Sequence, residues 1–362
     1  MRPRICAHAK CPRMTGGLVM MRALRKLDNG IGRLDVVELP VPHPGEGEAR
    51  IAVFAAGICG TDLHIIDGSY PSLPPVTLGH EIAGMVESVG TGVDLGWIGQ
   101  RVAPEPAIGC GTCDWCASGF PMHCPRRTSL GTHVDGGFAA YVVVPVRNLH
   151  ALPDSLSDAA GALVEPLACV CHGLFKSGSI VEGSRVIVTG PGTIGILAAQ
   201  VAVACGAQTT LVGLERDGLR LSIASKMGLD ARSLDSIETR ESLAAEVNTR
   251  AIDVVIECSG AEAAVVWALA SLRPRGHLVQ LGLLPEDVSV TLAGAVLREV
   301  TLTSSYGSNP KSWQRAVDLL SAGSIQLDPL VTSTLPLQGW ADAVRRAQSQ
   351  DGIKTLLDPR MP

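Results

Sequence analysis

The sequence predicts an α/β protein built from a β-rich domain and a doubly wound parallel sheet. Two observations lead to this fold class. Short β-type runs divided by turn signals occupy residues 21–146. From about residue 185 onward, strand-like and helix-like segments alternate, which is typical of a parallel sheet with right-handed helical crossovers.

Composition limits the class of protein. The chain has 362 residues, of which 46% are hydrophobic and 18% charged, as expected of a compact protein with about two domains. Its formal net charge of −5 offers no basis for binding nucleic acid or an anionic membrane. No apolar stretch approaches the ~20 residues of a membrane span. We therefore expect neither nucleic acid nor membrane as a partner.

The eleven cysteines indicate the redox compartment. An odd number cannot all pair, and residues 1–26 lack the apolar core of a signal peptide. We therefore expect a reducing, cytoplasmic environment. In such an environment, clustered cysteines bind metal or take part in catalysis.

The first part of the chain divides at the pair Met20 and Met21. Residues 1–20 show neither helical nor strand periodicity, and we interpret them as a disordered extension or a misassigned start. After the pair, runs such as residues 49–56 and 81–89 have the composition of β-strands.

The second part of the chain alternates in type. Strands are predicted at residues 185–189, 209–214, 252–257 and 277–281, and helices at 194–205, 218–227 and 261–272. The chain ends with a predicted helix at 311–322, a strand at 330–335 and a short helix at 341–348.

A glycine-rich turn joins the first strand of this part to its helix. Gly190, Gly192 and Gly195 form G-x-G-x-x-G, and Thr193 and Ile194 complete the motif at the start of the helix. The first glycine permits a tight turn, the second lets backbone approach a pyrophosphate, and the third lets helix and strand pack closely. The helix amino terminus favours the phosphate charge. The sequence therefore predicts a Rossmann domain that binds NAD or NADP.

The choice between the two cofactors depends on the end of the second strand. Gly213 stands where an aspartate commonly holds the adenosine ribose. Its absence removes a carboxylate that would repel a 2′-phosphate, and Arg216 is able to pair with one. Glu215 could instead reach the ribose as an acidic substitute. NADP is thus slightly favoured over NAD.

Four cysteines form the clearest metal motif. Their spacing is C-x2-C-x2-C-x7-C in a glycine-rich loop: Cys110, Cys113, Cys116 and Cys124. Four thiolates close a tetrahedral site without an open position, which favours a structural zinc over an iron–sulfur cluster. A zinc module for nucleic acid is a remote alternative, since only Arg126 and Arg127 would supply basic charge nearby.

A second set of residues suggests catalysis. Cys59 lies in G-I-C-G-T-D-L-H at residues 57–64, His80 and Glu81 lie in G-H-E, and Glu165 lies in E-P-L. Together with the four-cysteine loop and the nucleotide fold, these motifs make the chain over residues 21–362 resemble the medium-chain zinc-dependent alcohol dehydrogenases. The E-P-L motif resembles the sorbitol (polyol) and threonine dehydrogenase branch. An arginine that this branch often has near Gly218 is absent, as is the aspartate at Gly213.

The resemblance implies a domain organisation. Residues 21–165 and 308–362 would form a GroES-like catalytic domain, and residues 166–307 the inserted Rossmann domain. It also implies a homo-oligomer, a dimer or a tetramer.

The resemblance further implies a second zinc, so that two are expected per chain. Cys59, His80 and Glu81 would hold it, with Glu165 as a further ligand that substrate displaces or that acts through water. A zinc site of this charge lowers the pKa of a bound alcohol. Thr61 would accept the alcohol proton and pass it through the cofactor ribose to His64.

The predicted function is a zinc-dependent oxidoreductase. It would transfer a hydride between NAD(P) and a secondary alcohol of a polyol, a sugar acid or an amino alcohol. Glu165 and the 3% aromatic content favour such a polar substrate. The alternative is a simple alcohol or aldehyde dehydrogenase of the same fold.

Overall fold

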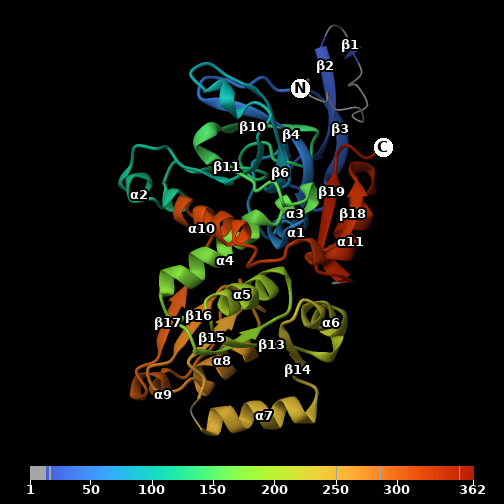
Figure 1. Ribbon diagram of the computed structural model, residues 1–362. Coiled ribbons are helices and arrows are strands. Elements are labelled where there is room, and N and C mark those ends of the chain that lie inside the picture. The colour runs from blue at the N-terminus through green and yellow to red at the C-terminus, as the bar shows by residue number, and fades with distance from the viewer. Residues whose placement is uncertain (1–13, 16–17, 250, 285–286, 350) are drawn as a thin grey trace.

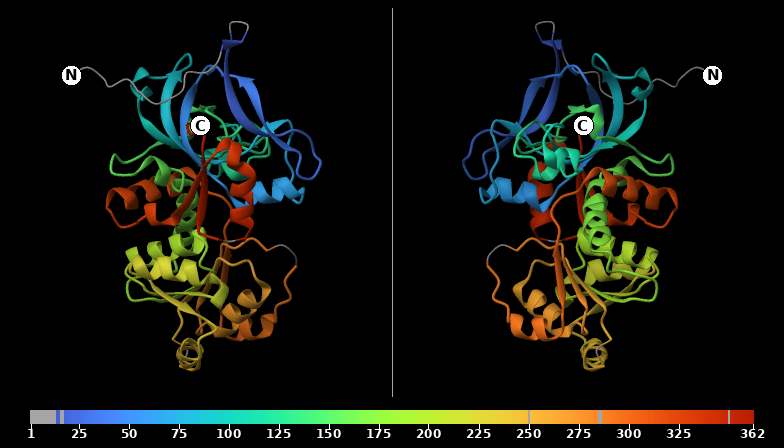
Figure 2. Two further views of the ribbon diagram at one scale, coloured as in Figure 1. Left: turned by 90° about the vertical axis from the view of Figure 1, so that its right-hand side faces the viewer. Right: turned by 90° about the vertical axis from the view of Figure 1, so that its left-hand side faces the viewer.

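The computed structural model describes residues 14–15, 18–249, 251–284, 287–349 and 351–362. Two units are stacked along the long axis of the molecule, a β-rich one and a nucleotide-binding one (Figures 1 and 2). No helix in these ranges is long and apolar enough to cross a membrane.

The β-rich unit is built around a seven-stranded sheet. Its order is β11-β7-β6-β4-β19-β18, and β10 also pairs with β4. These strands are β4 (Glu48–Gly57), β6 (Glu81–Val89), β7 (Arg101–Pro104), β10 (Tyr141–Pro145), β11 (Leu149–Ala151), β18 (Val331–Pro336) and β19 (Lys354–Asp358). Because β19 lies antiparallel to β4, the last residues of the chain complete a sheet that the first hundred begin.

A smaller sheet lies beside it. It consists of β1 (Met14–Thr15), β2 (Leu18–Lys26), β3 (Leu34–Pro40) and β5 (Val76–Thr77). Strand β2 begins at Leu18, and Met20 pairs with Pro40. The end of the expected extension is therefore part of a sheet, contrary to the prediction, because cross-strand pairing with β3 orders it. The same prediction for residues 1–13 and 16–17 lies outside the described residues.

The nucleotide-binding unit is a six-stranded parallel sheet, which confirms the predicted fold class. The strand order β14-β13-β12-β15-β16-β17 corresponds to 3-2-1-4-5-6, the Rossmann order. The strands are β12 (Arg185–Thr189), β13 (Gln208–Gly213), β14 (Asp230–Ser233), β15 (Val254–Glu257), β16 (His277–Gln280) and β17 (Thr301–Ser304). Its helices are α5 (Thr193–Ala204), α6 (Gly218–Lys226), α7 (Ile237–Asn248), α8 (Glu262–Ser271) and α9 (Leu292–Leu297).

Two helices connect the units at their junction. Helix α4 (Val164–Ser177) packs against α5 and against α10 (Pro310–Ser321), and one hydrophobic cluster includes Leu167, Ile196 and Trp313 from the three helices. The remaining helices are α1 (Gly60–Asp67), α2 (Asp114–Ala117), α3 (Asp158–Gly161) and α11 (Trp340–Ser349). The domain boundaries at residues 165 and 308 fall at this junction and stay predictions.

Candidate functional site

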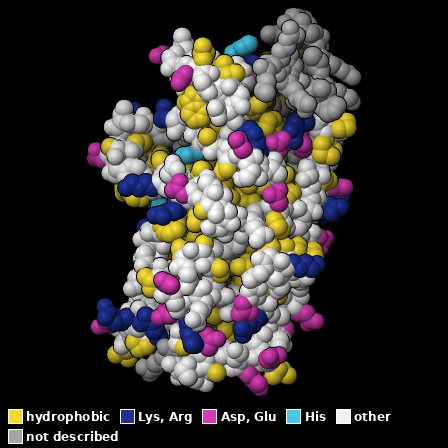
Figure 3. Space-filling view, viewed as in Figure 1, with side chains coloured by type: hydrophobic (Ala, Val, Ile, Leu, Met, Phe, Trp, Pro, Cys, Tyr) yellow, Lys and Arg dark blue, Asp and Glu magenta, His cyan; other side chains and the backbone are white. Residues whose placement is uncertain are grey.

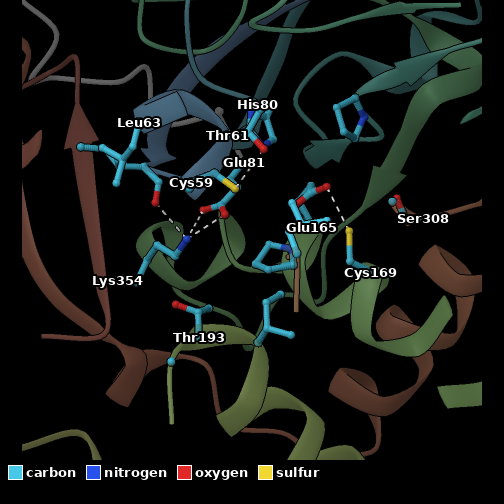
Figure 4. Close-up of a pocket in the computed structure, with 18 of the residues that line it drawn as sticks. Cys59, Thr61, Leu63, His80, Glu81, Glu165, Cys169, Thr193, Ser308 and Lys354 are labelled. Atoms are coloured by element: carbon cyan, nitrogen blue, oxygen red, sulfur yellow. Dashed lines mark hydrogen bonds and ion pairs between the residues drawn. The ribbon is translucent and has the colours of Figure 1, made fainter. Parts of the chain in front are cut away.

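A cleft of about 500 Å³ receives residues from both units (Figure 4). The β-rich unit contributes the residues expected at the catalytic zinc, and the nucleotide-binding unit contributes the start of α5. Among the predicted site residues, those that line the cleft are Cys59, Thr61, His80, Glu81, Glu165, Gly192, Thr193 and Ile194. Motifs more than a hundred residues apart in sequence thus meet in one place.

Asp62 fixes the backbone around Cys59 and His80. Cys59 caps the amino end of α1, and the fully buried Asp62 carboxylate accepts the Cys59 N–H at 2.9 Å and the Gly79 N–H at 3.2 Å. One Asp62 oxygen lies 3.8 Å from His80 Nδ1. The local sequence C-G-T-D therefore folds so that one carboxylate holds the two segments that carry the thiol and the imidazole.

The charge around His80 follows from these neighbours. Burial acts to lower the pKa of its imidazole, but the Asp62 carboxylate and the Cys59 sulfur outweigh burial and raise that pKa well above its usual value. The surroundings of His80 thus favour positive charge next to the ring. The negative charge of Asp62 and Cys59 would stabilise a bound metal cation in the same way, because the metal takes the place of the imidazole proton.

Glu81 has a strong partner that the sequence did not indicate. Lys354 Nζ, on β19, lies 2.7 Å from both Glu81 carboxylate oxygens and also donates to the Ile58 carbonyl at 3.1 Å. Both side chains are buried. Direct binding of zinc by Glu81 stays a prediction, but its charge is already balanced by this pair. No motif marks Lys354, which is 273 residues away in the chain.

Glu165 lies in the first turn of α4, at the junction of the two units. It is buried, and its Oε1 accepts a hydrogen bond from Cys169 Sγ one turn later at 3.3 Å. Burial is the main cause that raises the pKa of Glu165, and the neighbouring Glu81 acts in the same direction. Cys169, expected from the sequence to be a small buried hydrophobe, is therefore a cleft residue with a polar contact.

The two residues expected to move a proton occupy different positions on α1. Thr61 lines the cleft, with its Oγ1 3.8 Å from Cys59 Sγ. The His64 side chain is half exposed, and its Nδ1 lies 3.1 Å from Ser69 Oγ and 3.6 Å from Asp67. His64 is outside the set of described residues that line the cleft.

The four-cysteine loop gathers as a compact cluster. Its ligand atoms, one from each of Cys110, Cys113, Cys116 and Cys124, all lie within 4.8 Å of one another. Hydrogen bonds from Thr112 lower the pKa of Cys110 to about 5, whereas burial raises that of Cys116 to about 11. A bound divalent metal would convert the Cys116 thiol to a thiolate as well.

The glycine-rich turn has the geometry that the motif predicts. Gly190 has φ +88°, a conformation that suits glycine, and a Cβ on Gly195 would lie 1.9 Å from the Gly190 carbonyl oxygen. A Cβ on Gly192 would meet nothing within 4 Å, so the space in front of the α5 amino terminus is open. That space is where the motif places a pyrophosphate.

The structure explains the glycine at the end of β13. A Cβ on Gly213 would lie 2.7 Å from Pro191 Cγ, so close packing on the glycine-rich turn excludes a side chain there. Glu215 and Arg216 are exposed and do not line the described cleft. Arg220 does line it and donates to the Gly352 carbonyl at 2.7 Å. Arg220, two residues after Gly218, is thus an arginine of the cleft that the sequence motifs did not indicate.

Comparison with known proteins agrees with this fold and site. Two family models match, the alcohol dehydrogenase GroES-like domain over residues 45–154 and the zinc-binding dehydrogenase over residues 193–322. Among curated relatives, the sorbitol dehydrogenase of Halalkalibacterium halodurans is 37% identical over 94% of this chain and 99% of its own. The D-arabitol-phosphate dehydrogenase of Enterococcus avium is 33% identical over 93% and 97%.

Solved structures give the same result. A zinc-binding dehydrogenase from Sinorhizobium meliloti, described as putative and bound to NADP, superposes with a TM-score of 0.86 at 34% identity, covering 94% of this chain and 99% of its own. An alcohol dehydrogenase from Escherichia coli complexed with NADH superposes with a TM-score of 0.85 at 30% identity, with the same coverage.

The fold and the site define an oxidoreductase of the zinc type that uses a nicotinamide cofactor. The chain belongs to the medium-chain zinc-binding alcohol dehydrogenase family, as its motifs predicted.

Proposed function

We propose that this enzyme oxidises a secondary hydroxyl of a polyol-type substrate, or reduces the corresponding ketone, with one catalytic and one structural zinc per chain. The observation that carries the proposal is the meeting of Cys59, His80 and Glu165 in the cleft that the α5 amino terminus also lines. Relatives named for sorbitol, arabitol phosphate and galactitol phosphate support a polyhydroxylated substrate.

By chemical type the donor set suits a zinc ion, although among the described residues only the four-cysteine cluster has its ligand atoms within 4.8 Å of one another. Sulfur, imidazole nitrogen and carboxylate oxygen are all common zinc ligands, and a carboxylate behind the imidazole, here Asp62, is the usual supporting group. A zinc ion held by Cys59 and His80, with Glu165 as third ligand in place of the Glu81 that the family resemblance implies, would supply Lewis acidity at the substrate hydroxyl. The buried ion pair of Glu81 and Lys354 would lie next to these ligands and would add no net charge to the site.

The chain's own groups would handle the proton. Thr61, which lines the cleft, would accept a hydrogen bond from the reacting hydroxyl. His64, half exposed on the same helix, would exchange a proton with solvent. Glu165, held by the Cys169 thiol, would accept a hydrogen bond from a second substrate hydroxyl or from water when it does not bind the metal.

The cofactor would lie across the cleft with its pyrophosphate at the α5 amino terminus, bound there by the amides of Gly192, Thr193 and Ile194. A cofactor held there would supply the hydride-transfer chemistry. We keep a slight preference for NADP, because β13 ends without a carboxylate and because Arg220, which also pairs with Asp217 at 3.9 Å, lines the cleft.

We also propose that the enzyme is a homo-oligomer assembled through β17. This strand ends the parallel sheet, and apolar side chains near it are exposed, namely Leu292, Val296, Leu297 and Leu302. An edge strand with apolar neighbours is a template for pairing with a second copy.

The nine cysteines in the described part of the chain are all free, which supports the predicted reducing, cytoplasmic environment.

Metal analysis of variants tests the catalytic zinc. The intact protein is expected to contain two zinc ions per chain, and Cys59→Ala one, with loss of at least ~1,000-fold in kcat because the Lewis acid is gone. Cys205→Ala, at the carboxyl end of α5, is the control and should keep both ions. A single zinc in the intact protein would contradict the proposal.

A substrate panel tests the reaction. Polyols, sugar acids, amino alcohols and simple alcohols, each offered with NAD and with NADP, should give the highest kcat/KM for a polyhydroxylated substrate. A preference for simple alcohols would instead support the alternative dehydrogenase of the same fold.

A further inference from the structure

Arg127 is a cleft residue that neither zinc site uses. It follows the fourth cysteine of the structural cluster, and its backbone N–H donates to the Cys124 carbonyl at 3.0 Å. Its side chain is half-buried, and Nη1 donates to the Met122 carbonyl at 3.1 Å. The four-cysteine loop therefore fixes a guanidinium at the wall of the cleft.

The charge of Arg127 has no carboxylate partner in the described part of the chain within 4.0 Å, the distance that defines the ion pairs of this molecule. The two buried carboxylates of the cleft have other contacts, since Glu81 pairs with Lys354 and Glu165 accepts from Cys169. A half-buried guanidinium without a counter-ion is costly to desolvate, and it gains most when an anion binds it.

Two tyrosines border Arg127 and are not anions themselves. Its guanidinium lies 6.0 Å from the centre of the Tyr306 ring, and the Tyr306 and Tyr70 hydroxyls are 2.9 Å apart. Burial and the bond to Tyr306 raise the pKa of Tyr70 to about 12, although the charge of Arg127 and its hydrogen bond to Tyr70 act in the opposite direction, so this phenol stays neutral. Burial lowers the pKa of His133, and the nearby positive charge of Arg127 acts in the same direction.

The surroundings are otherwise suited to a polyhydroxylated molecule. Ser129 and Thr132, from the same loop region, also line the cleft and offer hydroxyls. The pyrophosphate of a dinucleotide belongs at the other unit, at the start of α5, and leaves Arg127 to the substrate.

We propose that Arg127 binds an anionic group of the substrate, a carboxylate or a phosphate, and that the bonded hydroxyl pair of Tyr70 and Tyr306 flanks it and donates the one O–H that the pair does not use itself. The inference rests on the proposed function and narrows it: the preferred substrate is a sugar acid or a polyol phosphate, not a neutral polyol. A planar guanidinium matches the two oxygens of either anion, which lysine does less well.

Matched substrates test the inference. The kcat/KM values of sorbitol, gluconate and sorbitol 6-phosphate are measured with the intact enzyme and with Arg127→Met. The intact enzyme should prefer an anionic member over sorbitol, and Arg127→Met should reduce that anionic-to-neutral ratio about 10- to 100-fold, the loss of a charged hydrogen-bonded contact. The anionic substrate with the higher kcat/KM shows whether Arg127 binds a carboxylate or a phosphate.

Controls separate charge from structure. Arg33→Met removes the same charge at an exposed position outside the cleft and should leave the ratio unchanged. Arg127→Lys should restore part of the ratio. An unchanged ratio in Arg127→Met, or a preference of the intact enzyme for sorbitol, would overturn the inference while leaving a polyol dehydrogenase.

A binding titration separates this inference from the proposed function. Inorganic phosphate and tartrate are titrated calorimetrically into the intact enzyme and into Arg127→Met. If no member of the full substrate panel is oxidised, the proposed function fails; saturable binding that Arg127→Met abolishes would still support an anion site at Arg127. Equal binding to both proteins, or none to either, would refute it.

Discussion

At the scale of single residues, buried charges control the site. Asp62, Glu81, Glu165 and Lys354 are all buried around one cleft, and each has a specific partner. Burying a charge is tolerated when opposite charge or hydrogen bonds compensate it, and is costly when a partner is removed. The arrangement therefore makes the stability of the protein sensitive to substitutions that touch neither substrate nor metal.

The Lys354 and Glu81 pair gives the first prediction at this scale. Lys354→Met leaves Glu81 buried without its cation, and we expect the free energy of unfolding to fall by about 3–5 kcal/mol in urea denaturation. The double variant Lys354→Met with Glu81→Gln should recover most of that loss. Equal destabilisation of the single and double variants would show that packing, not charge, is lost.

Which site residues could be predicted from the sequence follows from how local their signals are. Cys59, His80 and the four cysteines lie in short motifs with fixed spacing, so their positions were predictable. Lys354 carries no motif, and its relation to Glu81 exists only because β19 lies beside β4. Likewise, Gly213 has the sequence position of a ribose ligand, but only the fold brings it against Pro191, where a side chain has no room.

At the scale of elements, the carboxyl ends of the parallel strands are joined by Glu257. This fully buried residue ends β15, and its Oε1 accepts from the Thr189 hydroxyl on β12 at 3.1 Å and from the Ser259 N–H at 2.6 Å. Its Oε2 accepts from Gln280 of β16 at 2.6 Å. One carboxylate thus holds three strands at the edge where the glycine-rich turn begins.

Glu257→Ala should therefore affect both stability and cofactor binding. Several buried donors lose their acceptor, so we expect about 3 kcal/mol or more of destabilisation and weaker NAD(P) binding in calorimetric titration. Asp253→Asn, at the opposite end of β15, is the control, since Asp253 accepts from the Arg185 N–H at 2.7 Å far from the turn. It should reduce stability but not cofactor affinity. Unchanged cofactor binding in Glu257→Ala would contradict the role.

Elements were predictable where the pattern of apolar residues was strong. The runs that became β12, β15 and α5 are continuously apolar or clearly periodic. Strand β14, with the sequence D-A-R-S, and strand β17, with T-L-T-S, are short and polar, so no run marked them. They form because the neighbouring strands β13 and β16 supply backbone hydrogen bonds.

At the scale of the whole molecule, the distribution of surface charge does not point to a particular class of binding partner. Basic and acidic side chains are interspersed over the face shown in Figure 3. The stronger surface feature is the apolar edge around β17, where Leu297 is 86% and Leu302 53% exposed. Leu302→Arg should therefore shift the protein toward monomers, because it places charge in a strand-to-strand contact.

Light scattering after gel filtration measures this change in mass. The control is Leu95→Arg, since Leu95 is a comparably exposed leucine in the β-rich unit and stands away from β17. The intact protein and Leu95→Arg should share one mass, and Leu302→Arg should have a smaller one. The same mass for all three would mean that the edge is not the contact.

The pairing of β19 with β4 sets an order of events during synthesis. A chain emerging from the ribosome can complete the parallel sheet of the nucleotide-binding unit first, because all six strands precede residue 305. The β-rich sheet has to wait for the final strand, and until Lys354 arrives Glu81 has no cation to balance it. The candidate site is therefore completed after the nucleotide-binding sheet, and a chain without β19 would lack the cation that balances Glu81.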